Sequence, residues 1–224
     1  MTNNCIFPFV QTATLEMVGG KGLNLMRLTQ AGMPVPPGFV ISTAAYMAFM
    51  KFNHLEAVLA VLEQSQPLAE ISAQIRAAFE QGEFPADLAE AIQTAYCELG
   101  KNDLSVAVRS SATAEDLAEA SFAGQQDTYL NVRGEKDLLD AVRRCFGSLW
   151  SERAIDYRAR QGLAPLSVEL AVVVQQMVFA EAAGVVFTAN PHQRRCKPDR
   201  HGCRLRVGRS YRQWFGDPRS HRRR

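Results

Sequence analysis

Two short segments of the sequence carry residues suited to binding phosphate. Gly19-Gly20-Lys21-Gly22 places a lysine where a helix is expected to begin, and the unpaired N–H groups of a first helical turn attract anions. Farther along, Arg109 lies near the end of a predicted strand, and arginine supplies a fixed fork of N–H donors that matches phosphate oxygens. The Walker A pattern, a glycine-rich loop closed by Gly-Lys-Ser or Gly-Lys-Thr, is absent.

A run of small and polar residues follows the arginine. We expect a loop from Ser110 to Gly124, with the segment Ala123-Gly124-Gln125 at its end, and a new strand that begins at Thr128. Small side chains let the backbone approach ligand oxygens closely. The simpler alternatives are a flexible surface loop with an exposed arginine and, for Lys21, a glycine turn with a solvated lysine.

Hydrophobic periodicity predicts the elements that must position these residues. A helix is expected over 19–31, with Gly32 as its C-terminal cap. The alternation in 105–110 predicts a strand with Arg109 and Ala107 on one face and two valines on the other. Further elements are expected as strands at 39–42, 128–132 and 168–178, as two helices within 135–161, and as a mostly helical stretch at 43–99 broken near Asn53-His54, Pro67 and Pro85. This mixture, without strict strand–helix alternation, favours an α+β fold with a largely antiparallel sheet.

Composition excludes several classes of protein. A hydrophobic fraction of 47% over 224 residues is high enough for a packed core and argues against global disorder. No apolar stretch reaches the length of about 18 residues that a membrane span needs, and no signal peptide is recognised, so we expect a cytoplasmic protein without a membrane partner. The five cysteines have no zinc-site spacing, which favours reduced structural thiols and no metal site.

Charge is distributed unevenly along the chain. Residues 192–224 hold 12 basic and 2 acidic residues, a net charge of +10, whereas the remaining 13 basic and 21 acidic residues give 1–191 a net charge of −8. Such a basic block is typical of an arm that binds nucleic acid. We expect no nucleic-acid partner, because the block contains a single plausible stacking pair, Trp214-Phe215, and no recognisable binding module.

Four long motifs identify a family resemblance. VAVRSSATAEDLAEASFAGQQDTYLNV is similar, almost residue by residue, to a signature of phosphoenolpyruvate synthases and the related rifampicin phosphotransferases. The other three occur in the family's order along the chain: GGKGLNLMRLTQAGMPVPPGFVIST, CFGSLWSERAIDYRARQGL and LAVVVQQMVFAEAAGVVFTANP. The resemblance covers about 9–191 and is weakest in 50–100.

The resemblance implies an ATP-grasp-like nucleotide-binding domain with a helical insert at 43–99, in which two lobes hold ATP. Lys21 and Arg109 would then be the catalytic contacts to the ATP phosphates. The remaining ATP-binding residues implied by the matching motifs are Ala123, Gly124, Gln125 and Thr128 near the phosphates, and Gln175, Gln176, Met177 and Val178 along the adenine. Without the resemblance, Met177 and Val178 would be interpreted as core residues.

The same resemblance implies a reaction. In this family ATP donates a pyrophosphoryl group to a histidine on a separate domain, phosphate is released, and pyruvate receives the remaining phosphoryl group: ATP + pyruvate + H₂O → AMP + phosphoenolpyruvate + Pi. The rifampicin branch uses the same ATP domain with another acceptor. Mg²⁺ is implied as a cofactor, with its carboxylate ligands expected beyond Pro191.

We therefore expect ATP as the partner of this chain, pyruvate or another acceptor only through further domains, and no turnover by this chain alone. A non-catalytic nucleotide-binding module is the alternative; the oligomeric state is left open.

The last 33 residues depart from the family pattern. Reading Gln213-Trp214-Phe215 one base onward gives an obligatory glycine, and one permitted shifted reading contains the Gly-Leu-Gly-Glu motif that the family carries next. We therefore expect a partial ATP-grasp domain at 1–191, truncated in its second half. The tail at 192–224 is expected to be disordered and to result from a one-base frameshift near Pro191. Resequencing the transcript across that junction tests this expectation.

Overall fold

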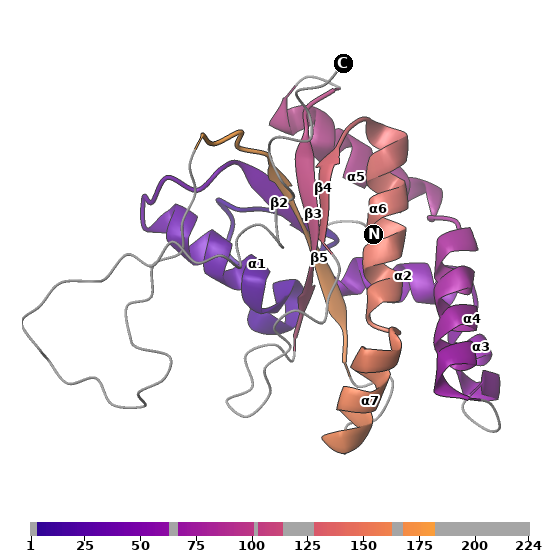
Figure 1. The fold of residues 1–224 in the computed structure, drawn as a ribbon. Helices are drawn as coiled ribbons and strands as arrows, with labels where there is room; N and C mark the ends of the chain where they lie inside the picture. Colours follow the sequence, from indigo (N-terminus) through magenta and orange to yellow (C-terminus); the bar gives the residue numbers. More distant parts are fainter. Residues whose placement is uncertain (1–3, 63–66, 101–102, 114–127, 163–167, 182–224) are drawn as a thin grey trace, which may run out of the picture. The chain divides into compact units, whose positions relative to one another are not determined.

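The computed structural model describes residues 4–62, 67–100, 103–113, 128–162 and 168–181 (Figure 1). The predicted glycine loop and the basic tail lie outside these residues. The chain falls into two units, Met1–Met177 and Val178–Arg224, and each is considered by itself. The elements of the first unit are, in chain order, β1 (Ile6–Pro8), α1 (Leu15–Gln30), β2 (Gly38–Ile41), α2 (Thr43–Phe52), α3 (Leu55–Leu62), α4 (Leu68–Gln81), α5 (Ala86–Leu99), β3 (Val106–Ala112), β4 (Thr128–Val132), α6 (Glu135–Ser148), α7 (Glu152–Arg160) and β5 (Leu170–Gln176).

A five-stranded sheet with the order β1-β2-β5-β3-β4 organises the unit, and each neighbouring pair is antiparallel (Figure 1). The α+β prediction with a largely antiparallel sheet is therefore confirmed for the described residues. β5 pairs with β2 on one side and β3 on the other, and it is buried along nearly its whole length. A central strand that is covered on both faces favours a continuous β-branched run, which explains the three consecutive valines Val172–Val174.

The two faces of the sheet are covered by different elements. α1 packs on β5, β3 and β2, where Val18 and Met26 meet Val40 and Val173. The opposite face packs against the other helices in a larger cluster that includes Val106 and Val108. The predicted split of β3, with these valines on one face and Arg109 on the other, is confirmed because Arg109 pairs with Val173 of the α1 side.

The described part of 43–99 is mostly helical, as predicted, and forms α2 to α5. The helices are interrupted at the predicted places: Asn53-His54 separates α2 from α3, and α4 and α5 begin directly after Pro67 and Pro85. His54 has a positive φ of 53°. The Asn53 side chain at the end of α2 bonds to both backbone groups of Glu83, which ties α2 to the connection between α4 and α5. No helix in the described part of the chain is long and apolar enough to cross a membrane. No disulfide joins the described cysteines, Cys5, Cys97 and Cys145, to one another.

One expectation about β3 is wrong. The sequence predicts a loop from Ser110 onward, but the strand continues to Ala112 because Ser110, Ser111 and Ala112 pair with Val172, Ala171 and Leu170 of β5. Both serines are buried. Hydroxyl-rich residues suggested a loop, whereas pairing with a neighbouring strand overrides that weak local preference.

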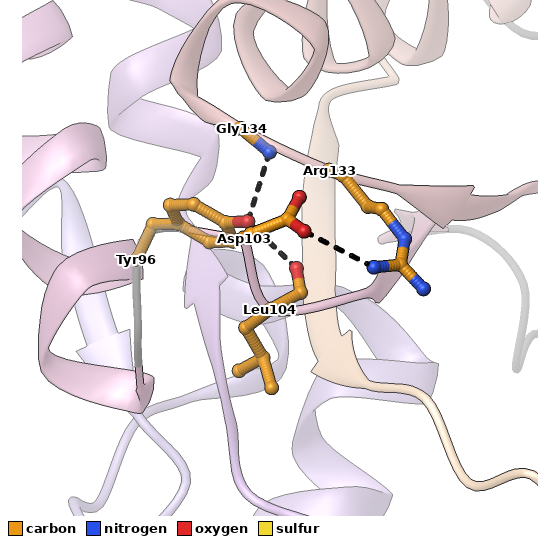
Figure 2. Close-up of polar contacts among 5 residues, drawn as sticks. All are labelled: Tyr96, Asp103, Leu104, Arg133 and Gly134. Carbon is orange, nitrogen blue, oxygen red and sulfur yellow. Dashed lines mark hydrogen bonds and ion pairs between the residues drawn. The ribbon is translucent and has the colours of Figure 1, made fainter.

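A buried contact holds β3 and β4 in place at the edge of the sheet. The Tyr96 hydroxyl on α5 donates to the Leu104 carbonyl, 2.6 Å away, and accepts from the Gly134 N–H at 3.0 Å (Figure 2). Leu104 precedes β3, and Gly134 lies between β4 and α6 with φ +76°. One side chain therefore fixes where β3 begins and where β4 gives way to α6.

Candidate functional site

Helix α1 is broken near its start, at the segment that carries Lys21. Gly19 has φ 66° and ψ 174°, so the helix starts afresh after it and Lys21 lies exposed in the first turn of the second section. A Cβ at Gly19 would lie 2.2 Å from the Ser111 carbonyl oxygen. Glycine is therefore required twice, by a backbone conformation that other residues rarely adopt and by the close approach of β3.

Arg109 lies in a row of residues that crosses three strands. It pairs with Thr128 on β4 and with Val173 on β5, and residues directly opposite one another in antiparallel strands point to the same face. That face is the one covered by α1. Thr128 is exposed at the edge of the row, and Arg109 is half-buried between the edge and the interior.

The Arg109 guanidinium is not fully satisfied within the fold. Its Nε is buried and has no hydrogen-bond partner in the described residues, and burial lowers the pKa of the group. Arginine nevertheless stays charged, because its ordinary pKa lies far above neutrality. A desolvated cation with an unused donor costs stability unless an anion meets it, so this position suits a negatively charged ligand.

The predicted adenine residues lie at the end of β5. Gln175 is 7% exposed, and its Nε2 donates to the Pro36 carbonyl at 3.2 Å, which holds the proline-rich turn against the sheet. The N–H groups of Gln176 and Met177 bond to the carbonyls of Pro37 and Ser105, each at 2.9 Å. In the second unit, Val178 is 62% exposed, which does not fit the alternative interpretation as a core residue.

The structure thus brings several predicted residues to one face of the sheet. Arg109, Thr128 and Gln175 occupy that face through strand register, and α1, which covers the face, carries Lys21. Ala123, Gly124 and Gln125 fall in 114–127, the segment that joins β3 to β4, and lie outside the described residues.

A hollow of about 490 Å³ lies elsewhere, between β4 and α6. Thr128 contributes to its lining, as do Asp137 and Asp140 of α6, a helix that packs on the face opposite α1. The lining also includes Arg144, so two carboxylates outnumber one guanidinium there, and the net negative charge makes this hollow a poorer phosphate site than the α1 face. Among the described residues, no group of three acidic, histidine or cysteine side chains could hold a metal ion.

Ser111 is a site residue that the sequence prediction missed, since it was assigned to a loop. Its hydroxyl donates to the Val18 carbonyl at 2.9 Å and accepts from the Gly22 N–H at 3.1 Å. The alternation that began at Val106 continues through Ser111, so the period of the strand is the signal that could have placed it on the face of Arg109.

Comparisons with known proteins identify the family of this chain. The family described as "Pyruvate phosphate dikinase, AMP/ATP-binding domain" matches residues 15–200. The chain belongs to this family. The resemblance that its four motifs indicate is therefore confirmed at the level of the family.

Similar proteins come from both branches of the family. A probable phosphoenolpyruvate synthase of Methanothermobacter thermautotrophicus is 51% identical over 185 residues, which cover 78% of this chain and 27% of that protein. The phosphoenolpyruvate synthase of Pyrococcus furiosus is 43% identical over 219 residues, covering 79% and 27%. The rifampicin phosphotransferase of Streptomyces sviceus is 46% identical over 189 residues, covering 81% and 22%. The chain spans about a quarter of the length of these relatives.

Proposed function

We propose that this chain binds ATP on the α1 face of its sheet, as the first part of an ATP-grasp-like domain. The observation that carries the proposal is the buried Nε of Arg109, which has no hydrogen-bond partner among the described residues, on the face covered by the helix that holds Lys21. Membership of a family named for AMP and ATP binding supports the choice of ligand. The limits of the domain, 1–191, are part of the proposal.

Each phosphate contact follows from the chemistry of its side chain. Arg109 would present its guanidinium fork to phosphate oxygens, and Lys21 would supply a compact positive charge from an opened helical turn. Thr128 adds a hydroxyl at the exposed end of the Arg109 row. The Ala123-Gly124-Gln125 backbone would cover the phosphates, since small residues permit close approach. Together these groups hold the phosphates in place and neutralise charge, which is most of what phosphoryl transfer requires.

The proposed adenine contacts at the end of β5 have few free hydrogen-bond donors. The N–H groups of Gln176 and Met177 already bond within the fold, as does the Gln175 side-chain amide nitrogen. Their contribution to the adenine would therefore come from carbonyl oxygens and from the Met177 side chain, with Val178 supplying an exposed apolar surface. No role is derived for Mg²⁺, because the described residues offer no metal cluster.

The proposed ancestral activity is that of a dikinase of the phosphoenolpyruvate synthase type. Pyruvate would be phosphorylated through a histidine on a domain that the relatives' greater length can accommodate. A rifampicin phosphotransferase is the second candidate, favoured by relatives of that name at 42% and 46% identity. We propose that this chain binds nucleotide without turnover. AMP formation from ATP by the 224-residue protein, with pyruvate or rifampicin present, would contradict that view.

Calorimetric titration of the full chain with ATP tests the binding proposal. The Lys21→Gln variant should weaken ATP binding about tenfold, because one phosphate-binding charge is lost. Lys51→Gln is the matched control, since it removes an exposed lysine from α2, on the other side of the sheet. Equal ATP affinity in the two variants, or no ATP binding by the wild-type chain, would overturn the proposed site.

A further inference from the structure

The Ser111 hydroxyl is inserted into the backbone of helix α1. In an unbroken helix, the Gly22 N–H would donate directly to the Val18 carbonyl four residues earlier. Here the helix opens at Gly19, and the Ser111 hydroxyl bridges the two groups instead. It accepts from the Gly22 N–H at 3.1 Å and donates to the Val18 carbonyl at 2.9 Å. The serine side chain is completely buried, so water does not offer these two groups an alternative partner.

The insertion keeps the turn open and gives both the Val18 carbonyl and the Gly22 N–H a hydrogen-bond partner. A side chain that enters the helical hydrogen-bond ladder is a recognised cause of a sharp break. Without it, the Val18 carbonyl and the Gly22 N–H would both be buried without partners, at a cost that favours closing or unravelling the turn. The glycine at position 19 makes the arrangement possible, since β3 approaches within 2.2 Å of where a Cβ would lie.

The bonded groups flank Lys21 closely in sequence. Lys21 precedes Gly22, and Arg109 lies two residues before Ser111 on the same face of β3. One hydroxyl therefore ties the turn that carries one cation to the strand that carries the other. The two elements are 89 residues apart in the chain, so no local preference could fix their relative position.

We propose that Ser111 is a positioning residue that sets the separation of Lys21 and Arg109 for a polyphosphate ligand. The proposal rests on the proposed ATP site. Ser111 does not touch the ligand; it acts through the opened turn of α1. Its removal should therefore affect binding of the phosphates and leave binding of the nucleoside part unchanged.

The test compares ATP with adenosine, which lacks phosphates, in titrations of the full chain. Ser111→Ala should raise the Kd for ATP about tenfold and leave the Kd for adenosine unchanged. Ser110→Ala is the matched control, because Ser110 is an equally buried serine on the same strand that points to the opposite face. It should leave the ratio of the two Kd values at its wild-type level.

A second variant guards against a folding defect. Ser111→Cys keeps a side chain of similar size and replaces the hydroxyl with a weak hydrogen-bonding group, so it should weaken ATP binding in the same direction without opening a gap. Amide exchange at Gly22 should accelerate in both variants. Unchanged ATP-to-adenosine ratios in Ser111→Ala and Ser111→Cys, with wild-type ATP binding intact, would overturn this inference alone. Failure of the wild-type chain to bind ATP would overturn the proposed function.

Discussion

On the face that packs against α2, α5 and α6 the central sheet presents aliphatic side chains to a cluster that includes aromatic rings, whereas on the α1 face the same strands carry Arg109, Ser111 and Gln175. The first face is stabilised mainly by burial of apolar surface, which does not depend on the direction of individual contacts. The second is held by hydrogen bonds between specific atoms and leaves a cation partly unsatisfied. The aromatic cluster and the proposed ATP site thus lie on opposite sides of one sheet, and mutations on the two sides should have separable effects on stability and ligand binding.

The largest effect is expected in the aromatic cluster. Phe146 is fully buried and packs against Tyr46, Phe49 and Phe84, so Phe146→Ala should lower the free energy of unfolding by about 3–5 kcal/mol. Phe52→Ala is the matched control, because Phe52 is 53% exposed and should cost far less. Urea denaturation of both variants measures the difference. Similar losses would show that the described burial does not govern stability on this face.

Arg109→Met should impair ATP binding and leave stability intact, the reverse of what is expected for Phe146→Ala. Removing the guanidinium should raise the Kd for ATP about 100-fold, or about 2.7 kcal/mol. The free energy of unfolding should stay constant or rise, because an apolar chain replaces a partly desolvated cation whose Nε has no partner among the described residues. Calorimetry with ATP and a urea melt measure the two quantities. Arg27→Met, which removes an exposed arginine from the last turn of α1, is the control. A large loss of stability with unchanged ATP affinity would assign Arg109 to the scaffold.

Gly19→Ala separates backbone strain from close packing. Gly19 and Gly32 both have positive φ, 66° and 74°, but an alanine Cβ would meet β3 at the first and nothing within 4 Å at the second. Gly32→Ala should cost about 1 kcal/mol from conformation alone, and Gly19→Ala about 2 kcal/mol or more, because β3 must also move. Thermal melts compare them. Equal costs would mean that the contact between α1 and β3 yields easily.

The smallest effects concern the Tyr96 hydrogen bonds and the Arg133–Asp103 ion pair drawn in Figure 2. Tyr96→Phe removes a hydroxyl that bonds to Leu104 and Gly134, and should lower stability by about 1 kcal/mol. Arg133→Met breaks an exposed ion pair with Asp103, with side chains 51% and 80% exposed, and should cost at most about 0.5 kcal/mol. Urea midpoints that rank the two in the reverse order would contradict the role given to Tyr96.

Much of the fold could be predicted because its signals are local. The helical stretch 43–99 has its breaks at the predicted residues, and β4 has the predicted bounds Thr128–Val132. β1 was not predicted, since three residues are too few to show a period, and its pairing with β2 alone makes it a strand. The end of β3 was placed too early, because Ser110 and Ser111 resemble loop residues until β5 pairs with them.

By itself the sequence determined the family, the α+β class and the candidate cations Lys21 and Arg109, since motif identity and hydrophobic period are properties of neighbouring residues. Strand order, and the break in α1 that Ser111 completes, were decided only by the tertiary structure. The physical reason is distance along the chain: the Ser111 hydroxyl meets Val18 across 93 residues, and no local preference of either segment specifies that bond. Packing of β3 against Gly19 brings the two together, and with them the turn of Lys21 and the strand of Arg109.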